Sequence, residues 1–237
     1  MRTIGLIGGM SWESSSEYYR LINQLVRDRL GPLRSAQVLM FSVDFGPVAR
    51  AQHEGRWDDA AAILEAAAQR LAAGGAECIV LCTNTMHKVA DRIREATPLP
   101  FLHIADPVGQ GAGRLGVKKV GLLGTAFTMN EGFMKERLRQ AHGLEVLVPG
   151  ADERADIHRI IYDELCAGIV RDESRAIYRR VIRSLAARGA EAVILGCTEI
   201  TLLVTAADSG LPLLDSTALH AAAAVDFALA DESAETA

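Results

Sequence analysis

The amino-acid sequence predicts an α/β fold in which one unit of strands and helices occurs twice, each copy built around a parallel sheet. Three short segments of the first half return in the same order in the second half. The pairs are Gly75–Thr85 with Gly189–Glu199, Thr3–Gly8 with Lys119–Gly124, and Leu99–Leu102 with Leu211–Leu214. Three ordered matches indicate a duplication over most of the chain, and 237 residues suit two such units.

Strands and helices alternate through the first half. Ile4–Ile7 is an apolar run typical of a buried strand, and Ser11 or Ser14 can cap a helix that continues until Gly31 and Pro32. Further apolar runs and Ala-rich segments continue the alternation. The remaining expected elements are a strand at 37–43, a helix at 57–73, a strand at 78–81, a helix at about 85–96 and a strand at 101–104.

The second half repeats the alternation, which predicts a parallel sheet with right-handed connections in each half. A helix from Asp106 to about Val117 leads into it, and an acidic, frayed tail is expected from Asp231. Between them we expect strands at 120–123, 144–148, 192–195 and 211–215, and helices at about 130–142, 152–167, 172–188 and 217–229.

Composition restricts the class of protein. Apolar residues make up 49% of the chain, enough for a sizeable core, and the formal charge is −5 with both signs interspersed. The chain therefore lacks the basic stripe of a nucleic-acid binder and a polybasic membrane patch. The first residues read as a strand and not as a signal peptide, and the four dispersed cysteines suit a reducing compartment without disulfides. We expect a cytoplasmic protein.

Thiol and hydroxyl groups follow the two repeated strands. In the repeat Thr83 is equivalent to Cys197, whereas Cys82 is equivalent to Gly196. Cys197 comes directly after a buried strand and before an expected helix, where backbone N–H groups favour a thiolate and so a competent base. The alternative, a buried and inert cysteine, stays open.

Polar residues beside these positions suit a small zwitterion. Asn84 and Thr85 follow Thr83, and Thr198 and Glu199 follow Cys197, so hydroxyl, amide and carboxyl groups lie next to free backbone N–H groups. Helix capping explains the same residue types and is compatible with binding. Met10 is expected to line a pocket after the first strand.

The sequence lacks the common motifs for dinucleotide binding, for serine hydrolases and for zinc proteases. The glycines of G-L-I-G-G-M lack the dinucleotide-binding spacing, and neither a G-x-S-x-G nor an H-E-x-x-H motif occurs. Cys78, Cys82 and His87 have no common metal-site spacing, so we expect structural roles for them and no metal.

Three motifs resemble the aspartate/glutamate racemase family over essentially the whole chain: C-T-N-T-M-H at 82–87, G-C-T-E-I at 196–200 and I-G-L-I-G-G-M-S-W-E-S at the start. The resemblance implies amino-acid inversion without pyridoxal phosphate or another cofactor, and usually a homodimer. It implies two pseudo-symmetric three-layer α/β/α domains with parallel sheets and an active site in the interdomain cleft. We assign 1–100 with 212–237 to the N-terminal domain and 101–211 to the C-terminal domain.

The first motif departs from the family pattern C-N-T-x-H, because Thr83 stands where the family has cysteine. Cys82 is displaced by one residue, which on a strand turns its side chain to the other face. The chain thus resembles a subgroup with a threonine and cysteine pair, in which the cysteine of the second half handles the L-isomer. The resemblance implies Thr83 and Cys197 as catalytic residues.

The resemblance also guides the choice of substrate. We expect Gln52 and Glu164 to contact the substrate. Gln52 matches a substrate-contacting position of the threonine subgroup, with a solvated loop glutamine as the alternative, whereas typical aspartate racemases carry a basic residue near the position of Glu164. We expect aspartate or glutamate, with preference for the L-isomer, and a broad or different specificity is the alternative. The competing functions are a cofactor-free decarboxylase or isomerase on the same scaffold and a non-catalytic amino-acid-binding clamp.

Overall fold

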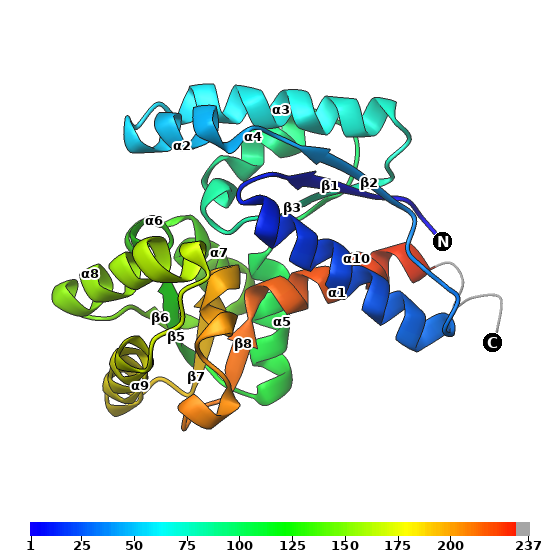
Figure 1. The fold of residues 1–237 in the computed structure, drawn as a ribbon. Coiled ribbons are helices and arrows are strands. Elements are labelled where there is room, and N and C mark those ends of the chain that lie inside the picture. The colour runs from blue at the N-terminus through cyan, green and yellow to red at the C-terminus, as the bar shows by residue number, and fades with distance from the viewer. Residues whose placement is uncertain (231–237) are drawn as a thin grey trace. The chain divides into compact units, whose positions relative to one another are not determined.

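The computed structural model describes residues 1–230, which form two compact units (Figure 1). Of the described residues, 1–103 and 220–230 form the first unit, and 104–219 form the second. Each unit has a four-stranded parallel sheet with helices on both faces, which confirms the predicted fold class. No helix within residues 1–230 has the length and apolar character needed to cross a membrane. The tail expected from Asp231 lies outside the described residues.

The first unit has the strand order β2-β1-β3-β4. The strands are β1 (Ile4–Gly8), β2 (Val38–Ser42), β3 (Cys78–Leu81) and β4 (Phe101–Leu102). Helices α1 (Trp12–Leu30) and α10 (Ser216–Leu229) cover one face. The other face is covered by α2 (Phe45–His53), α3 (Trp57–Ala73), the 3-10 helix η1 (Thr85–Val89) and α4 (Ala90–Glu95).

The second unit repeats this topology in the order β6-β5-β7-β8. Its strands are β5 (Lys119–Gly124), β6 (Glu145–Leu147), β7 (Ala192–Gly196) and β8 (Leu213–Asp215). Helices α5 (Ala105–Leu115) and α7 (Phe133–His142) pack on one face. The other face holds α6 (Ala126–Asn130), α8 (Ala151–Arg159), the π-helix η2 (Ile160–Glu164), η3 (Leu165–Ala167), α9 (Asp172–Ala187) and η4 (Thr198–Leu202), with η5 (Ala206–Asp208) leading to β8.

The duplication extends to individual hydrogen bonds. Gly75 and Gly189 occupy equivalent turns before β3 and β7 with φ of 93° and 94°, a left-handed conformation that glycine adopts without steric cost. Two residues after each glycine, a glutamate accepts a backbone N–H from the neighbouring strand. These bonds join Thr3 N to Glu77 Oε2 at 2.6 Å and Lys119 N to Glu191 Oε2 at 2.8 Å.

In each unit, one helix belongs to the chain segment that directly follows the last strand of the other unit. Helix α5 follows β4 of the first sheet but packs in the core of the second unit, and most of α10 follows β8 but packs in the core of the first. Strand β8 pairs with β7, so residues 212–219 belong to the second unit, and assigning them to the first is wrong. The units divide at 103/104 and 219/220 instead of 100/101 and 211/212.

Helix α2 was not expected from the sequence, which placed no element between the strand at 37–43 and the helix at 57–73, although Gly46 and Pro47 are compatible with a helix start. Both residues lie in its first turn, where proline lacks only an N–H that has no partner in any helix, and Asp44 caps the helix through Gly46 N at 3.0 Å. Gln52 is therefore a helix residue, and its side chain is buried. The alternative of a solvated loop glutamine is wrong.

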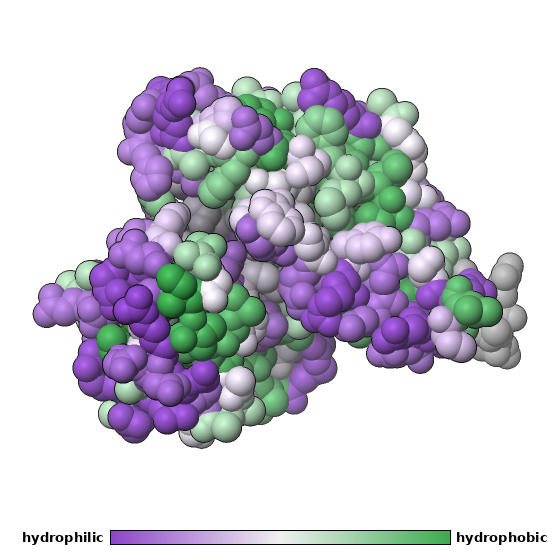
Figure 2. All heavy atoms as spheres, in the orientation of Figure 1, coloured by the Kyte–Doolittle hydropathy of each residue, from purple (hydrophilic) through white to green (hydrophobic). Residues whose placement is uncertain are grey.

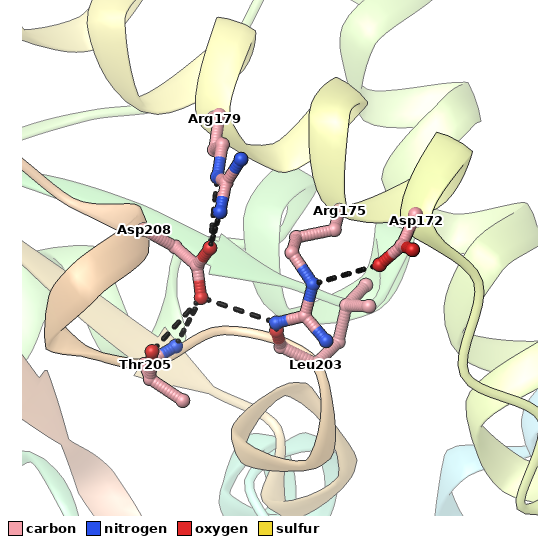
Figure 3. Close-up of polar contacts among 6 residues, drawn as sticks. All are labelled: Asp172, Arg175, Arg179, Leu203, Thr205 and Asp208. Carbon is pink, nitrogen blue, oxygen red and sulfur yellow. Dashed lines mark hydrogen bonds and ion pairs between the residues drawn. The ribbon is translucent and has the colours of Figure 1, made fainter.

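A network of polar contacts fixes the segment between β7 and β8 (Figure 3). Asp208 accepts hydrogen bonds from Thr205 N at 2.9 Å and from Thr205 Oγ1 at 3.0 Å. Arg179 and Arg175 of α9 pair with the same carboxylate at 2.6 and 3.2 Å. These contacts, Thr205 first and then Arg179, lower the pKa of Asp208 to about 2.

The second unit exposes several large apolar side chains around η3 and η4. Tyr162, Ile169, Val170 and Leu202 are 36%, 39%, 46% and 55% exposed. Figure 2 shows hydrophobic residues, in green, gathered on the visible face of this unit. These exposed side chains belong to η2, to η4 and to the segment after η3.

Candidate active site

Thr83 lies directly after β3 in the first unit. Its N–H donates to Leu81 O at 2.8 Å, which forms a tight turn, and the Thr83 side chain is half-buried. Cys82 instead joins the buried cluster that faces α1 and α10, and burial raises the pKa of its thiol. In this unit the hydroxyl of Thr83, and not the thiol of Cys82, is accessible at the strand end.

The imidazole of His87 holds the turn at Thr83. His87 Nδ1 lies 2.8 Å from Thr83 O, and because a carbonyl only accepts, Nδ1 carries the proton. Burial, and then His103 and His220, lower the pKa of His87 well below its ordinary value. His87 is therefore neutral near pH 7 and locks the backbone of Thr83 through one directed bond.

A second histidine joins this buried cluster. His220 Nε2 lies 2.8 Å from Leu102 O, and its Nδ1 lies 2.9 Å from Tyr18 Oη. The rings of His87 and His103 meet edge to face at 4.6 Å. No group of three or more His, Cys, Asp or Glu side chains within the described part of the chain is arranged to hold a metal. His87 and His220 each contact a backbone carbonyl of the first unit, Thr83 O and Leu102 O.

The loop after β1 places Met10 against the core. Gly9 has φ of 93°, and a Cβ there would lie 2.1 Å from Val43 O, so only glycine fits. Met10 and Met86 belong to the same buried cluster, and Gln52 Nε2 lies 2.8 Å from Met86 Sδ. The structure therefore brings Met10 and Gln52 to one cluster, both buried. Of the neighbouring candidates, Asn84 is also buried and Thr85 is half-buried.

Cys197 occupies the equivalent place in the second unit. It follows β7, is half-buried, and its Sγ donates to Glu199 Oε2 at 2.9 Å. Thr198 between them is half-buried. Gly196 precedes Cys197 because a Cβ there would lie 2.9 Å from Leu123 O of β5. The close approach of β7 and β5 explains why the second copy has glycine where the first has Cys82.

Burial raises the pKa of the Cys197 thiol well above its ordinary value, and Glu199 adds to this effect. The expectation that helix N–H groups lower this pKa is wrong for the structure, because η4 is a single five-residue 3-10 turn and the carboxylate faces the sulfur. The thiol is protonated near pH 7. The sulfur of Cys197 can act as a base only after its proton has been removed, and the carboxylate of Glu199 is the group in contact with it.

Glu164 is held within the second unit. Its carboxylate accepts hydrogen bonds from Ser174 Oγ at 2.5 Å and from Arg159 Nη1 at 2.8 Å. Ser174 first, and then Arg159, lower the pKa of Glu164. Arg159 and Glu164 are five residues apart, the spacing that the π-helix η2 brings onto one face. The negative charge of Glu164 is thus balanced by Arg159 of the same unit.

Two tyrosines near Cys197 were missed by sequence reasoning. Burial first, and then Cys197, raises the pKa of Tyr162 to about 12. Tyr178 on α9 is fully buried, and burial and then Cys197 raise the pKa of its hydroxyl as well. Both positions read as ordinary apolar helix positions in the sequence, so only the packing of α9 and η2 around β7 reveals them. His87 was detectable, since it follows Thr83 by one helical turn.

Comparison with known proteins places the chain in a family. Residues 7–224 match the sequence profile of the Asp/Glu/hydantoin racemases. A protein from Yersinia pestis assigned to the Asp/Glu racemases has a crystal structure that aligns with a TM-score of 0.92 and 53% identity, covering 97% of this chain and 100% of the other. An aspartate racemase homologue from Pyrococcus horikoshii OT3 aligns with a TM-score of 0.85 and 33% identity, covering 96% and 99% of the two chains.

A curated relative agrees with this placement. The glutamate racemase of Roseiflexus sp. (strain RS-1) is 29% identical over 159 residues, which are 62% of this chain. The match spans about half, 53%, of that enzyme's length. The chain belongs to the Asp/Glu/hydantoin racemase family, a family of isomerases.

Proposed function

We propose that this protein is a cofactor-independent amino-acid racemase that removes and returns the proton on Cα of aspartate or glutamate, with preference for the L-isomer. The single observation that carries the proposal is the pair of equivalent strand ends: a thiol, Cys197, follows β7, and a hydroxyl, Thr83, follows β3. In this proposal the two side chains approach opposite faces of the substrate Cα.

Cys197 takes the Cα proton of the L-isomer in this mechanism. The thiol first passes its proton to the Glu199 carboxylate, 2.9 Å away, which leaves a thiolate and a carboxylic acid. The thiolate then removes the Cα proton, and the electron pair delocalises into the substrate carboxylate. Reversal of the step returns the proton, or solvent hydrogen after exchange at sulfur, to the same face.

Inversion requires proton delivery from the other face, where we place Thr83. An alcohol is a far weaker acid and base than a thiol near pH 7, so this half of the reaction is slow. A catalyst cannot alter the equilibrium between enantiomers, so the asymmetry appears in exchange and not in the final ratio. The chain should exchange the Cα hydrogen of the L-isomer quickly and invert either isomer slowly.

Incubation of each enantiomer in heavy water tests the proposal. Proton NMR reports loss of the Cα signal, and chiral chromatography reports inversion. We expect rapid exchange from L-aspartate or L-glutamate and much slower exchange from the D-isomers. Equal exchange from both enantiomers would contradict the asymmetric mechanism, carbon dioxide release would indicate a decarboxylase, and binding without exchange would indicate an amino-acid-binding clamp.

A panel of amino acids tests the substrate class. The subgroup resemblance supports an acidic side chain, whereas Glu164 replaces a basic residue and is itself paired with Arg159. We propose that Gln52, Asn84, Thr85 and Thr198 contribute polar contacts, with Met10 packing beside them. Faster exchange on a neutral amino acid than on L-aspartate and L-glutamate would move the assignment away from acidic substrates.

We also propose that the protein works in the cytoplasm as a homodimer without pyridoxal phosphate, as the family resemblance implies. Light scattering of the purified protein should give twice the 25.4 kDa chain mass. In a separate test, dialysis against hydroxylamine, which removes pyridoxal phosphate, should leave the activity of the protein unchanged.

A further inference from the structure

Tyr162 is an aromatic residue of the second unit that the proposed mechanism leaves without a task. It lies in the π-helix η2, and its side chain is exposed. Within residues 1–230 its hydroxyl takes part in no hydrogen bond. Single π-turns are rare in helices and occur frequently at functional sites. An accessible hydroxyl on such a turn is therefore a candidate for contact with a ligand.

A chain of contacts fixes where the Tyr162 ring lies. The ring packs against His158, four residues earlier, with the ring centroids 4.6 Å apart and the ring planes inclined at 54°. His158 Nδ1 in turn accepts a hydrogen bond from Ala126 N at 3.2 Å. Ala126 is the first residue of α6 and comes two residues after the end of β5. The Tyr162 ring is therefore tied to the C-terminal end of β5.

The end of β5 is also next to Cys197. Gly124, the last residue of β5, is the register partner of Gly196, which immediately precedes Cys197. The two strands approach closely there, since a Cβ on Gly124 would lie 3.0 Å from Gly196 O. In addition, η3, which follows η2, packs against η4, which follows Cys197. Tyr162 and Cys197 therefore lie at the same edge of the second sheet.

The electrostatics of the phenol agree with this placement. Burial first, then Cys197, Cys166 and Glu199, raise the pKa of Tyr162 to about 12. The phenol therefore keeps its proton near pH 7 and acts as a hydrogen-bond donor and not as a base. The sulfur of Cys197 is already in contact with Glu199. The donor that Tyr162 offers is thus available for the molecule on which Cys197 acts.

The chemistry of proton removal indicates which group of that molecule needs a donor. A thiolate that takes the Cα proton lies next to Cα, and the α-carboxylate is attached to the same carbon. As the proton leaves, the electron pair moves into this carboxylate, and its negative charge increases. Donors aimed at the place where charge develops stabilise the transition state more than the ground state. A protonated phenol beside Cys197 is such a donor.

We propose that Tyr162 is a catalytic residue that donates a hydrogen bond from its phenol O–H to the α-carboxylate of the substrate whose Cα proton Cys197 removes. The inference rests on the proposed function. The phenol O–H bond stays intact throughout, and the proton that moves in this step passes from Cα to the sulfur of Cys197. Because every amino acid carries the α-carboxylate, Tyr162 contributes to the rate and not to the choice of side chain.

The variant Tyr162→Phe tests this role, since it keeps the ring against His158 and removes the hydroxyl alone. Deuterium incorporation at Cα measures the exchange rate on the L-isomer. We expect kcat/KM to fall by about a hundredfold, mainly through kcat, because a donor to the developing charge is lost. The same factor should apply to L-aspartate and to any neutral amino acid that the wild type exchanges. The melting temperature and the alkylation rate of Cys197 by iodoacetamide should stay unchanged.

A matched control and a binding measurement complete the test. Tyr19 on α1 is 52% exposed and lies in the other unit, so Tyr19→Phe should leave kcat/KM unchanged. In protein labelled with carbon-13 at tyrosine Cζ, the NMR signal of Tyr162 is identified by its loss in Tyr162→Phe. We expect L-aspartate to shift this signal. L-isoasparagine, which has an amide in place of the α-carboxylate, should not shift it.

Three outcomes overturn the inference. An unchanged kcat/KM in Tyr162→Phe, with an active wild type, would remove Tyr162 from the reaction and leave the racemase proposal standing. A loss confined to acidic substrates would place the hydroxyl at the side-chain carboxylate instead. If the wild type exchanges no amino acid, the racemase proposal fails, and an unshifted Tyr162 signal with L-aspartate would then overturn the contact as well.

Discussion

The residues at the ends of β3 and β7 differ in the one atom on which the proposed proton transfer depends. Sulfur at Cys197 and oxygen at Thr83 occupy equivalent places, and Cys82 is fully buried on the face toward α1 and α10. The internal repeat predicted this exchange of cysteine for threonine without any structure. The thiol pKa was not predictable, because it depends on burial and on the side-chain direction of Glu199.

Substitution at these two positions should have opposite effects. Thr83→Cys supplies a competent acid and base on the slow side, so inversion should accelerate by at least about tenfold while exchange on the L-isomer stays similar. Cys197→Ala removes the proposed base and should reduce exchange by more than about a hundredfold. Chiral chromatography and deuterium incorporation measure the two rates. Unchanged exchange in Cys197→Ala would remove Cys197 from the mechanism.

His87 gives a second prediction at this scale. His87→Leu loses the bond from Nδ1 to Thr83 O and should slow inversion by about tenfold, since the turn that carries Thr83 loosens. His87→Asn can place an amide N–H near the position of Nδ1 and should recover much of the loss, whereas His87→Gln has a longer side chain and should not. Equal inversion rates in the three variants would assign His87 to packing alone.

At the scale of elements, apolar periodicity predicted the strands and the long helices, but it did not predict the short helical turns. The single helix expected at 152–167 is an α-helix, a π-turn and a 3-10 turn, and this change of pitch brings Arg159 to Glu164. Similarly, the helix expected at 130–142 is α7, which begins at Phe133, and a separate short helix, α6, ends at Asn130. Tertiary hydrogen bonds decide such changes of pitch, so local sequence does not reveal them.

The contacts of Asp208 should govern the acid stability of the second unit (Figure 3). The pKa of Asp208 falls from an ordinary 3.8 to about 2 on folding, so its stabilisation is complete above the unfolded pKa and is lost as pH falls toward 2. Asp208→Ala should reduce the free energy of unfolding at pH 7 by about 2 to 3 kcal/mol, since Arg175 and Arg179 lose a shared partner. Urea unfolding between pH 2 and 7 measures both effects.

The pH profile supplies the control for this prediction. The stability of Asp208→Ala should fall less steeply than that of wild type between about pH 4 and pH 2, so the two profiles converge in acid. As a comparison, Asp58→Ala removes an exposed ion pair with Arg92 and should change stability by less than about 0.5 kcal/mol. Parallel profiles for Asp208→Ala and wild type would show that Asp208 does not titrate in this range.

At the scale of the whole molecule, the repeat predicted two units of the same topology, and the structure confirms it. The repeat by itself did not predict where the chain returns to the first unit; the domain assignment made with the family resemblance placed this return at 211/212, and the structure has it at 219/220. Helix α10 follows the repeated segment L-P-L-L-D of the second copy, so its place in the first unit depends on tertiary packing that sequence periodicity does not contain.

The exchanged helices predict that a contiguous half of the chain is insufficient for folding. A fragment of residues 1–103 lacks α10, so the face of β1 and β3 that carries Leu6 and Val80 would be exposed. We expect a largely unfolded fragment by circular dichroism. Addition of a peptide of residues 216–230 should restore helicity, whereas the same peptide with Ala224→Asp and Val225→Asp should not. Cooperative unfolding of the fragment alone would contradict the prediction.

The exchange of α5 and α10 also bears on how the chain can be rearranged. Arg2 N donates to Ala228 O at 2.9 Å, so the first residues and the last turn of α10 meet inside one unit. A circular permutant that starts at His220, with a short linker joining residue 230 to residue 1, would encode each unit as one uninterrupted stretch. If this permutant folds, the two-unit architecture does not depend on the order in which the segments are synthesised.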